Sequence, residues 1–280
     1  MAADAFPPGP PSNRLPPEID TSKAHSARVW DYWLGGKDNY PADQVTGEQV
    51  REVLPDIVDA AIADRAFLGR AIRHLAGQVG IRQFLDIGTG LPTADNTHEV
   101  AQRIAPNSRV VYVDNDPLVL AHARALLTST PVGKTAYIDA DARKPEYIVK
   151  EAKKTLTFTA PIAISMLGIL EHITNHDDAY NIVRYLLSTV PSGSHLVIAD
   201  PVAGISDTLA ESIRVWNQQS VNPIVARTRE QFAVFFEGLE LLEPGLVPCV
   251  QWRPDAVDQL EGEDYQNKVP WLMCGVGRKP

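Results

Sequence analysis

Cysteine is scarce in this chain of 280 residues, which contains only Cys249 and Cys274. Both cysteines lie in apolar stretches. Two cysteines can build neither a disulfide framework nor a zinc cluster, so we expect two reduced thiols in the core and no metal site. Reduced thiols are typical of a cytoplasmic protein, and we predict that location for this one.

Basic runs and long apolar runs are also missing. The chain has 26 Lys and Arg against 35 Asp and Glu, a net charge of -9. Nucleic-acid binding needs clustered Lys and Arg, so we expect no nucleic-acid partner. The most apolar stretch, residues 161–170, is too short for a membrane span of about 20 residues. The N-terminus lacks the basic and apolar regions of a signal peptide, so we expect no membrane partner.

The first 80 residues divide into two regions. Frequent prolines in residues 1–20 deny the backbone helix and sheet hydrogen bonds, which predicts a disordered lead. Residues 21–80 predict three helices: one that stops at Gly35-Gly36, one that begins at Pro41, and one over residues 56–75. We interpret these helices as a cap in front of a third region, residues 81–280.

In that third region, apolar runs alternate with helical segments. Such alternation is typical of an α/β fold with a mostly parallel, doubly wound, Rossmann-like sheet covered by helices on both faces. Two further apolar runs near the end of the chain fit an antiparallel hairpin at the sheet edge. The seven predicted strands lie within residues 84–87, 110–113, 135–138, 162–166, 195–199, 239–250 and 272–276.

The residues at the ends of the first two predicted strands are typical of a nucleoside-binding site. Gly88 and Gly90 allow a sharp turn and close approach of a ligand to the backbone. Asp114 ends the next strand, where its carboxylate can accept hydrogen bonds from both ribose hydroxyls. Thr93 stands where a dinucleotide fingerprint has its third glycine. Asp86 can hold either the loop or a ligand ammonium group, which favours a nucleoside that carries an amino acid.

Together with these turns, other segments resemble the class I S-adenosylmethionine-dependent methyltransferases. Within that class, the chain resembles an actinobacterial group of S-adenosyl methyltransferase-like proteins of unknown function. The matching segments are residues 27–39, 83–93, 114–117, 245–248 and 252–255. The resemblance implies S-adenosyl-L-methionine as the cofactor and methyl transfer as the activity.

The resemblance also implies a set of cofactor contacts by position. Three of them have alternative interpretations: Asp141 as a helix cap, Met166 as a core side chain and Asn115 as a turn residue. The implied contacts are Gly88, Thr89 and Gly90 under the methionine part, Asp114 on the ribose, Asn115 beside the adenine, Asp141-Ala142 at the adenine amino group, and Met166 beside the sulfonium.

Methyl transfer needs a general base only if the acceptor holds a proton at neutral pH. Glu171 and His172, after the fourth predicted strand, are the catalytic candidates, although they could also form a solvated loop pair or cap a helix. The aromatic segment 30–40 could close over the pocket and attract the sulfonium, or serve only in helix packing.

We therefore predict a methyltransferase that acts on a small-molecule acceptor, because the acidic balance disfavours nucleic acid and the helical cap suggests an enclosed acceptor site. Two alternatives remain open. One is a protein that binds S-adenosylmethionine without catalysis. The other is an NAD-dependent oxidoreductase, whose pyrophosphate site would need a glycine in place of Thr93. The acceptor and the oligomeric state stay open.

Overall fold

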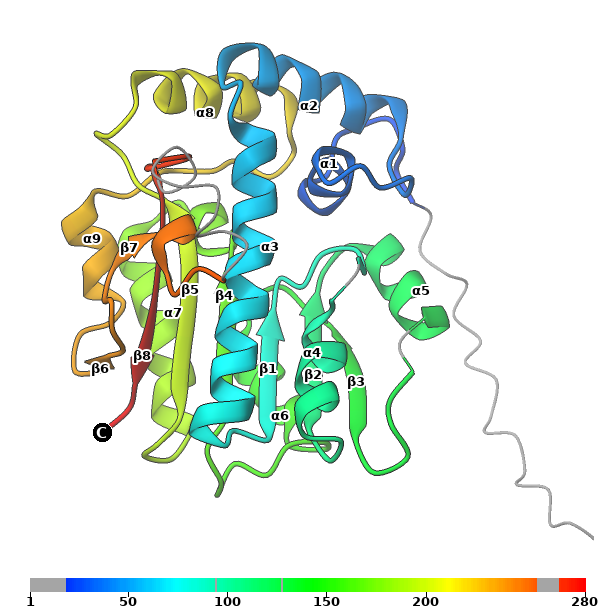
Figure 1. Cartoon of the computed structure of the whole chain (residues 1–280). Coiled ribbons are helices and arrows are strands. Elements are labelled where there is room, and N and C mark those ends of the chain that lie inside the picture. Colours follow the sequence, from blue (N-terminus) through cyan, green and yellow to red (C-terminus); the bar gives the residue numbers. More distant parts are fainter. Residues whose placement is uncertain (1–18, 94, 127, 256–266) are drawn as a thin grey trace, which may run out of the picture.

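A mixed β-sheet lies at the centre of the computed structural model (Figure 1). The structure describes residues 19–93, 95–126, 128–255 and 267–280, and within them the sheet has eight strands in the order β3-β2-β1-β4-β5-β8-β6, with β7 also paired to β8. Strands β1 to β5 are parallel, and β6 to β8 are antiparallel to their neighbours. Their bounds are β1 Gln83–Ile87, β2 Arg109–Asp114, β3 Lys134–Asp139, β4 Ala163–Leu167, β5 His195–Pro201, β6 Glu240–Leu241, β7 Val247–Pro248 and β8 Leu272–Arg278.

Helices cover both faces of the sheet and the rim where the parallel strands end. In Figure 1, α3 and α4 cross one face, α6 and α7 lie behind the other, and α1, α2 and α8 lie above the carboxyl ends of the strands. The α-helices are α1 Ser26–Trp33, α2 Pro41–Val53, α3 Ile57–His74, α4 Thr97–Ile104, α5 Pro117–Leu126, α6 Pro145–Ala152, α7 His176–Thr189, α8 Asp207–Gln219 and α9 Arg229–Val234, with short turns η1 Leu75–Val79, η2 Leu170–His172 and η3 Cys249–Gln251.

Local chemistry accounts for several helix ends. Gly35 adopts a left-handed φ of 75° just after α1, which releases the chain from the helix. At the start of α4, the Asn96 amide donates to the Glu99 carboxylate at 2.8 Å, as the Asn-x-x-Glu spacing predicts. Pro41 occupies the first position of α2, where its missing N–H costs nothing.

The central strands are apolar on both faces, because helices cover both. On β1, Phe84 packs with the α3 side of the core, whereas its neighbour Leu85 packs with the α6 and α7 side. The alternation repeats on β2 at Val110 and Val111. Side chains at successive strand positions therefore belong to different cores.

The predicted fold class is confirmed, with one difference at the sheet edge. The apolar run 239–250 forms two short strands, β6 and β7, because Pro244 and Gly245 interrupt it; Gly245 has a φ of 89°. Both short strands pair antiparallel with β8, which lies between them and β5. The predicted single strand is thus divided, which raises the count from seven to eight.

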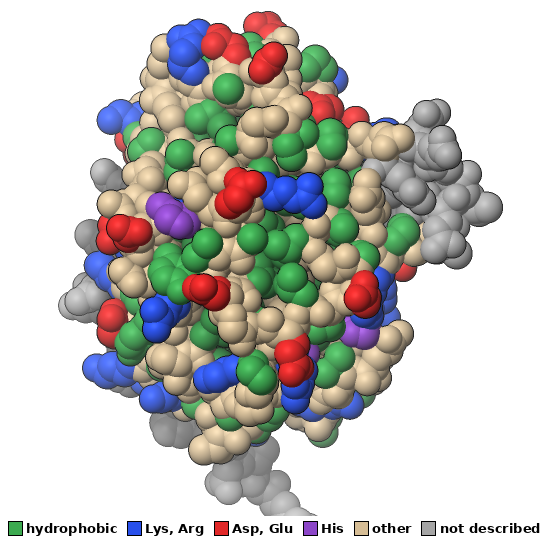
Figure 2. Space-filling view, turned by 90° about the vertical axis from the view of Figure 1, so that its left-hand side faces the viewer, with side chains coloured by type: hydrophobic (Ala, Val, Ile, Leu, Met, Phe, Trp, Pro, Cys, Tyr) green, Lys and Arg blue, Asp and Glu red, His purple; other side chains and the backbone are tan. Residues whose placement is uncertain are grey.

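Residues 1–18 of the predicted disordered lead lie outside the described residues. No helix in the described part of the chain is both long and apolar enough to cross a bilayer. Figure 2 shows basic side chains lying among acidic and apolar ones on the face that it presents. Both cysteines are buried free thiols.

Candidate active site

The strand order reverses between β1 and β4, so the loops after these strands diverge and leave a crevice at the rim. Three adjoining cavities, formed by described residues, lie there. The central cavity is lined by Asp86, Gly88 to Gly90 and Asp114, together with α1 and α3. The side cavity is lined by Asn115 and residues 140–143. The apolar cavity is lined mainly by aliphatic side chains and tryptophans, with Glu171 and His172.

Asp114 lies between the central and side cavities and organises the loops around it. Its carboxylate accepts hydrogen bonds from the amides of Gly90 at 2.8 Å, Asn115 at 2.8 Å and Asp116 at 3.0 Å. Burial raises the pKa of the carboxyl, while the amides of Asp116 and Gly90 oppose that rise. A single acid therefore joins the turn after β1 to the turn after β2 at the floor of the crevice.

Asp86 is a buried acid at the end of β1. It accepts hydrogen bonds from the hydroxyls of Thr97 at 2.6 Å and Ser165 at 2.7 Å. Burial raises its pKa, and the two hydroxyls oppose the rise. Both interpretations of this acid are compatible with the geometry, because Asp86 holds neighbouring elements together and also lines the central cavity.

Gly88 is required where the loops after β1 and β4 meet. Its φ is 77°, and a Cβ there would lie 1.8 Å from the Ile169 side chain. Gly90 also has a left-handed φ, 66°, but a Cβ at that position would meet no atom within 4 Å. The space beside Gly90 belongs to the central cavity, so the backbone there is open to a ligand.

The side cavity contains the residues predicted for the adenine end. Asn115, Asp141 and Ala142 all line it. Arg143 donates two side-chain hydrogen bonds to Asp141, from Nε at 2.9 Å and from Nη2 at 2.8 Å. Burial raises the pKa of Asp141, but the hydrogen bonds and charge of Arg143 outweigh burial and hold it below its usual value. This carboxylate is therefore ionised and able to accept a further hydrogen bond.

Met166 does not lie where the resemblance implies. It lies within β4, fully buried in the core on the side of α6 and α7, and lines none of the three cavities. Because strand side chains alternate, it is the next residues, Leu167 and Gly168, that reach the central cavity. The predicted contact of Met166 with the sulfonium is corrected accordingly.

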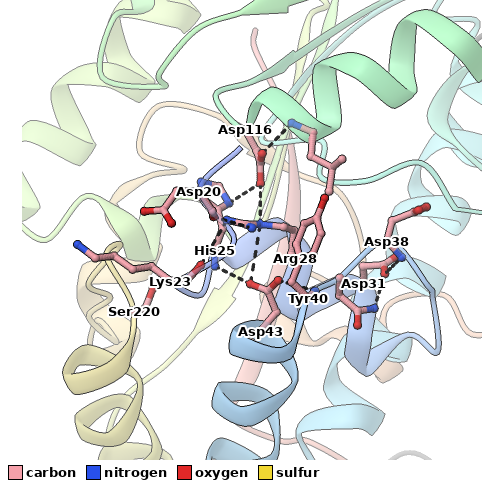
Figure 3. A network of polar contacts seen from close by, with 12 residues as sticks. Asp20, Lys23, His25, Arg28, Asp31, Asp38, Tyr40, Asp43, Asp116 and Ser220 are labelled. Atoms are coloured by element: carbon pink, nitrogen blue, oxygen red, sulfur yellow. Dashed lines mark hydrogen bonds and ion pairs between the residues drawn. The ribbon is translucent and has the colours of Figure 1, made fainter. Parts of the chain in front are cut away.

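Helix α1 forms a roof over the central cavity and is fixed by a buried ionic network (Figure 3). Asp116, on the turn after β2, lies 3.0 Å from His25 Nδ1 and 3.4 Å from Arg28 Nε. Arg28 Nε also lies 3.8 Å from Asp43 of α2, and the His25 amide donates to the same Asp43 carboxylate. Arg28, Asp43 and Asp116 are buried. The roof is thus tied to the turn that carries Asp114.

The sequence analysis missed two charged residues of the site, Asp64 and Arg65 of α3. Both line the central cavity, and Asp64 Oδ1 and Arg65 Nη2 are buried without a hydrogen-bond partner among the described residues. Burial, together with the charge of Asp86, raises the pKa of Asp64 to about 7, and the charge of Arg65 opposes this rise. The available signal was the position of Asp64 on the otherwise apolar stripe of its helix, between Ala61 and Leu68.

Glu171 and His172, the catalytic candidates, lie on the short turn η2 and line the apolar cavity. Burial, helped by the charge of Asp64, raises the pKa of Glu171 to about 8. Burial lowers the pKa of His172 to about 4. At neutral pH both side chains are therefore uncharged, although His172 Nε2 lies 3.9 Å from Glu171 Oε1. The carboxyl holds its proton, and the imidazole is unprotonated.

The buried carboxyl of Glu171 makes a pH-dependent contribution to stability. Its pKa rises from the ordinary value of 4.5 to about 8 on folding, so its contribution is complete below pH 4.5 and is lost as the pH rises toward 8. We expect Glu171→Gln, which keeps the neutral form, to match the wild type near pH 5. At pH 8 we expect it to be about 3 to 4 kcal/mol more stable in urea unfolding. Exposed Glu52→Gln is the control, and equal pH profiles for wild type and Glu171→Gln would contradict the expectation.

The parallel sheet, its switch point and the loops after β1, β2 and β4 define a Rossmann-like methyltransferase fold. The model of the S-adenosyl methyltransferase family matches residues 12–280, and the chain therefore belongs to this family. No curated protein shows significant similarity to the chain.

Two solved structures are similar over nearly the whole chain. A DUF574 family protein from Streptomyces avermitilis is 44% identical, with a TM-score of 0.88 over 94% of this chain and 100% of that one. A candidate methyltransferase from Thermobifida fusca is 40% identical, with a TM-score of 0.86 over 96% of this chain and 99% of that one. Mitomycin 7-O-methyltransferase, 16% identical with a TM-score of 0.50 over 90% of this chain and 68% of that one, shares the fold alone.

Proposed function

We propose that the protein transfers the methyl group of S-adenosyl-L-methionine to a small-molecule acceptor. The observation that carries the proposal is the continuity of the three cavities. The central and side cavities share Gly88 and Asp114, and the central and apolar cavities share Trp30 and Gly168. A nucleoside could thus lie along the rim with its reactive end at the mouth of the apolar cavity.

The polar groups fit the parts of this cofactor in order. In the central cavity, the unpartnered Arg65 Nη2 suits the methionine carboxylate, and the unpartnered Asp64 Oδ1 suits the ammonium group. Asp114, which lines both cavities, could accept hydrogen bonds from the ribose hydroxyls, and Asp141 in the side cavity could accept one from the adenine amino group. Two unpartnered polar atoms of opposite type in one cavity favour a zwitterionic ligand.

The cofactor supplies an activated methyl group, so the protein has mainly to align donor and acceptor and to exclude water. Trp30 lies at the boundary of the central and apolar cavities, where its indole can attract a cation and close the site to solvent. His172, held neutral by burial, can accept the proton of an acceptor hydroxyl. Glu171, which holds its own proton at neutral pH, can donate a hydrogen bond to the acceptor.

The alternative of a nicotinamide cofactor has weaker support. Thr93 lines the central cavity at the place where a dinucleotide site needs a third glycine for the pyrophosphate.

Calorimetric titration tests the donor. We expect binding of S-adenosylmethionine and S-adenosylhomocysteine, and none of NAD; the reverse order would overturn the proposal. Turnover is tested separately, by supplying the protein with a radiolabelled methyl donor and an extract of small metabolites. Transfer of label supports catalysis, whereas tight binding without transfer to any acceptor supports the non-catalytic alternative.

Gly90→Ala tests whether the ligand approaches the backbone in the central cavity. Alanine at this left-handed position costs about 1 kcal/mol in stability, and its Cβ would occupy ligand space. We expect affinity for S-adenosylhomocysteine to fall about tenfold, since a steric change of 1.4 kcal/mol has that effect. Gly80→Ala is the matched control, because Gly80 also has a left-handed φ and open surroundings but lies outside the central cavity. Equal affinities in the two variants would contradict the prediction.

A further inference from the structure

The apolar cavity lies between α1, α2, α3 and α8 and has an empty volume of about 590 Å³. Its walls include Trp33, Trp216 and Trp271, all buried, and aliphatic side chains such as Leu54 and Ile213. A cavity with this lining has the character of a site for a small apolar molecule. Because it opens on Trp30 and Gly168, which also line the central cavity, its occupant would face the donor methyl group.

The three buried tryptophans offer apolar rings to this cavity, since their N–H groups are already used elsewhere. Trp33 donates to the carbonyl of Gly47 at 3.2 Å, and Trp216 to the carbonyl of Asn222 at 2.8 Å. Trp271 donates to the Asp56 carboxylate at 2.9 Å. Their remaining contribution is ring surface, which favours planar aromatic partners.

Few polar groups remain for an occupant to contact. Among the described residues that line the apolar cavity, none is Lys, Arg or Asp. Ser212 lines it too, but its hydroxyl donates to the Leu209 carbonyl at 2.8 Å. Glu171 and His172 are therefore the polar pair that an occupant would meet, and both are uncharged at neutral pH. A charged occupant would lose its hydration without gaining a partner charge.

We propose that the methyl acceptor is an uncharged, planar aromatic molecule whose hydroxyl group faces Glu171 and His172. This inference rests on the proposed function. In the reaction, the hydroxyl oxygen forms a bond to the methyl carbon as the bond from that carbon to sulfur breaks, and the bonding electron pair stays on sulfur. The hydroxyl proton passes to the imidazole of His172, and Glu171 donates a hydrogen bond that orients the oxygen.

Calorimetry with three matched probes tests the inference, each titrated into the protein saturated with S-adenosylhomocysteine. The probes are neutral 1-naphthol, anionic 1-naphthoate and cationic 2-(1-naphthyl)ethylammonium. We expect 1-naphthol to bind at least tenfold more tightly than either charged probe. Equal or tighter binding of a charged probe would overturn the inference, as would absence of 1-naphthol binding.

A cavity-filling variant tests whether 1-naphthol binds in the apolar cavity. Ile213→Trp is expected to weaken 1-naphthol binding more than tenfold and to leave affinity for S-adenosylhomocysteine unchanged. Ile205→Trp, at an exposed residue outside the apolar cavity, is the control. Ile224→Trp fills the same cavity from another segment and replaces Ile213→Trp if that variant fails to fold. Unchanged 1-naphthol binding in the filled variant would overturn the inference, whereas failure of the wild type to bind S-adenosylhomocysteine would overturn the proposed function instead.

Discussion

Replacing Asp114 by alanine is expected to weaken the binding of S-adenosylhomocysteine about 100-fold. In the proposed complex this carboxylate accepts hydrogen bonds from the two ribose hydroxyls, and hydrogen bonds to a charged group contribute about 1.5 to 3 kcal/mol each. Together they contribute about 3 to 6 kcal/mol, and the 100-fold factor corresponds to a loss of about 2.7 kcal/mol, just below the lower end of that range. The carboxylate also accepts three amide hydrogen bonds from the loops that line the central cavity, so the loops lose a fixed geometry as well.

Asp139 provides a matched control for this prediction. It pairs in register with Asp114 at the end of the neighbouring strand, but it is exposed and lines none of the three cavities. Asp139→Ala is expected to leave affinity within about twofold of the wild type. Thermal unfolding of Asp114→Ala distinguishes loss of the ligand contact from loss of the fold. A folded Asp114→Ala protein that binds as tightly as Asp139→Ala would show that the ribose lies elsewhere.

Replacing Asp116 by asparagine is expected to lower the free energy of unfolding by about 3 kcal/mol. The change removes the negative charge that faces His25 and Arg28, while an oxygen remains to accept the amide of Leu118. Removal of one partner from a buried ion pair costs about 3 to 5 kcal/mol, because the other charge stays buried. Asp43, at 3.8 Å from Arg28, offsets part of that cost, which places the expectation at the lower end.

The control is Asp38→Asn, since Asp38 pairs with His122 at 3.2 Å on the surface, where its side chain is 46% exposed. A surface pair contributes about 0 to 1 kcal/mol, so urea unfolding of this variant is expected to match the wild type closely. Burial alone would raise the pKa of Asp116, but the hydrogen bond and charge of His25 and the charge of Arg28 lower it overall. The stability contributed by Asp116 is therefore complete above pH 3.8 and is lost as the pH falls through the lowered pKa. A loss below 1 kcal/mol at neutral pH would mean that the network does not hold α1.

Much of the proposed cofactor site could be predicted from sequence, because its residues stand at or just after the ends of strands. Gly88, Asp114 and Asp141 each stand at the end of a parallel strand, and such ends meet at a single edge of the sheet. Local spacing is enough to place them there. The structure brings them to adjoining cavities, which is the arrangement that the motifs indicate.

Asp64 and Arg65 could not be placed by the same reasoning. They lie on a helix that precedes β1, and only the packing of α3 across the sheet brings them to the rim. The predicted contact of Met166 with the sulfonium was wrong for a different reason. A strand end is known from sequence only to within a residue or two, and a shift of one residue moves a side chain to the opposite face. The prediction of a single strand within residues 239–250 was wrong because Pro244 and Gly245 interrupt an otherwise continuous apolar run.

The position of β8 has a consequence for how the protein is made. Trp271 and Leu272, at the start of this strand, form part of the apolar cavity, and β8 enters the sheet between β5 and the earlier-made β6. During translation the residues of the central cavity, up to Ile169, emerge long before them. The wall of the apolar cavity that Trp271 and Leu272 form is therefore completed only after β8 has been synthesised and has entered the sheet.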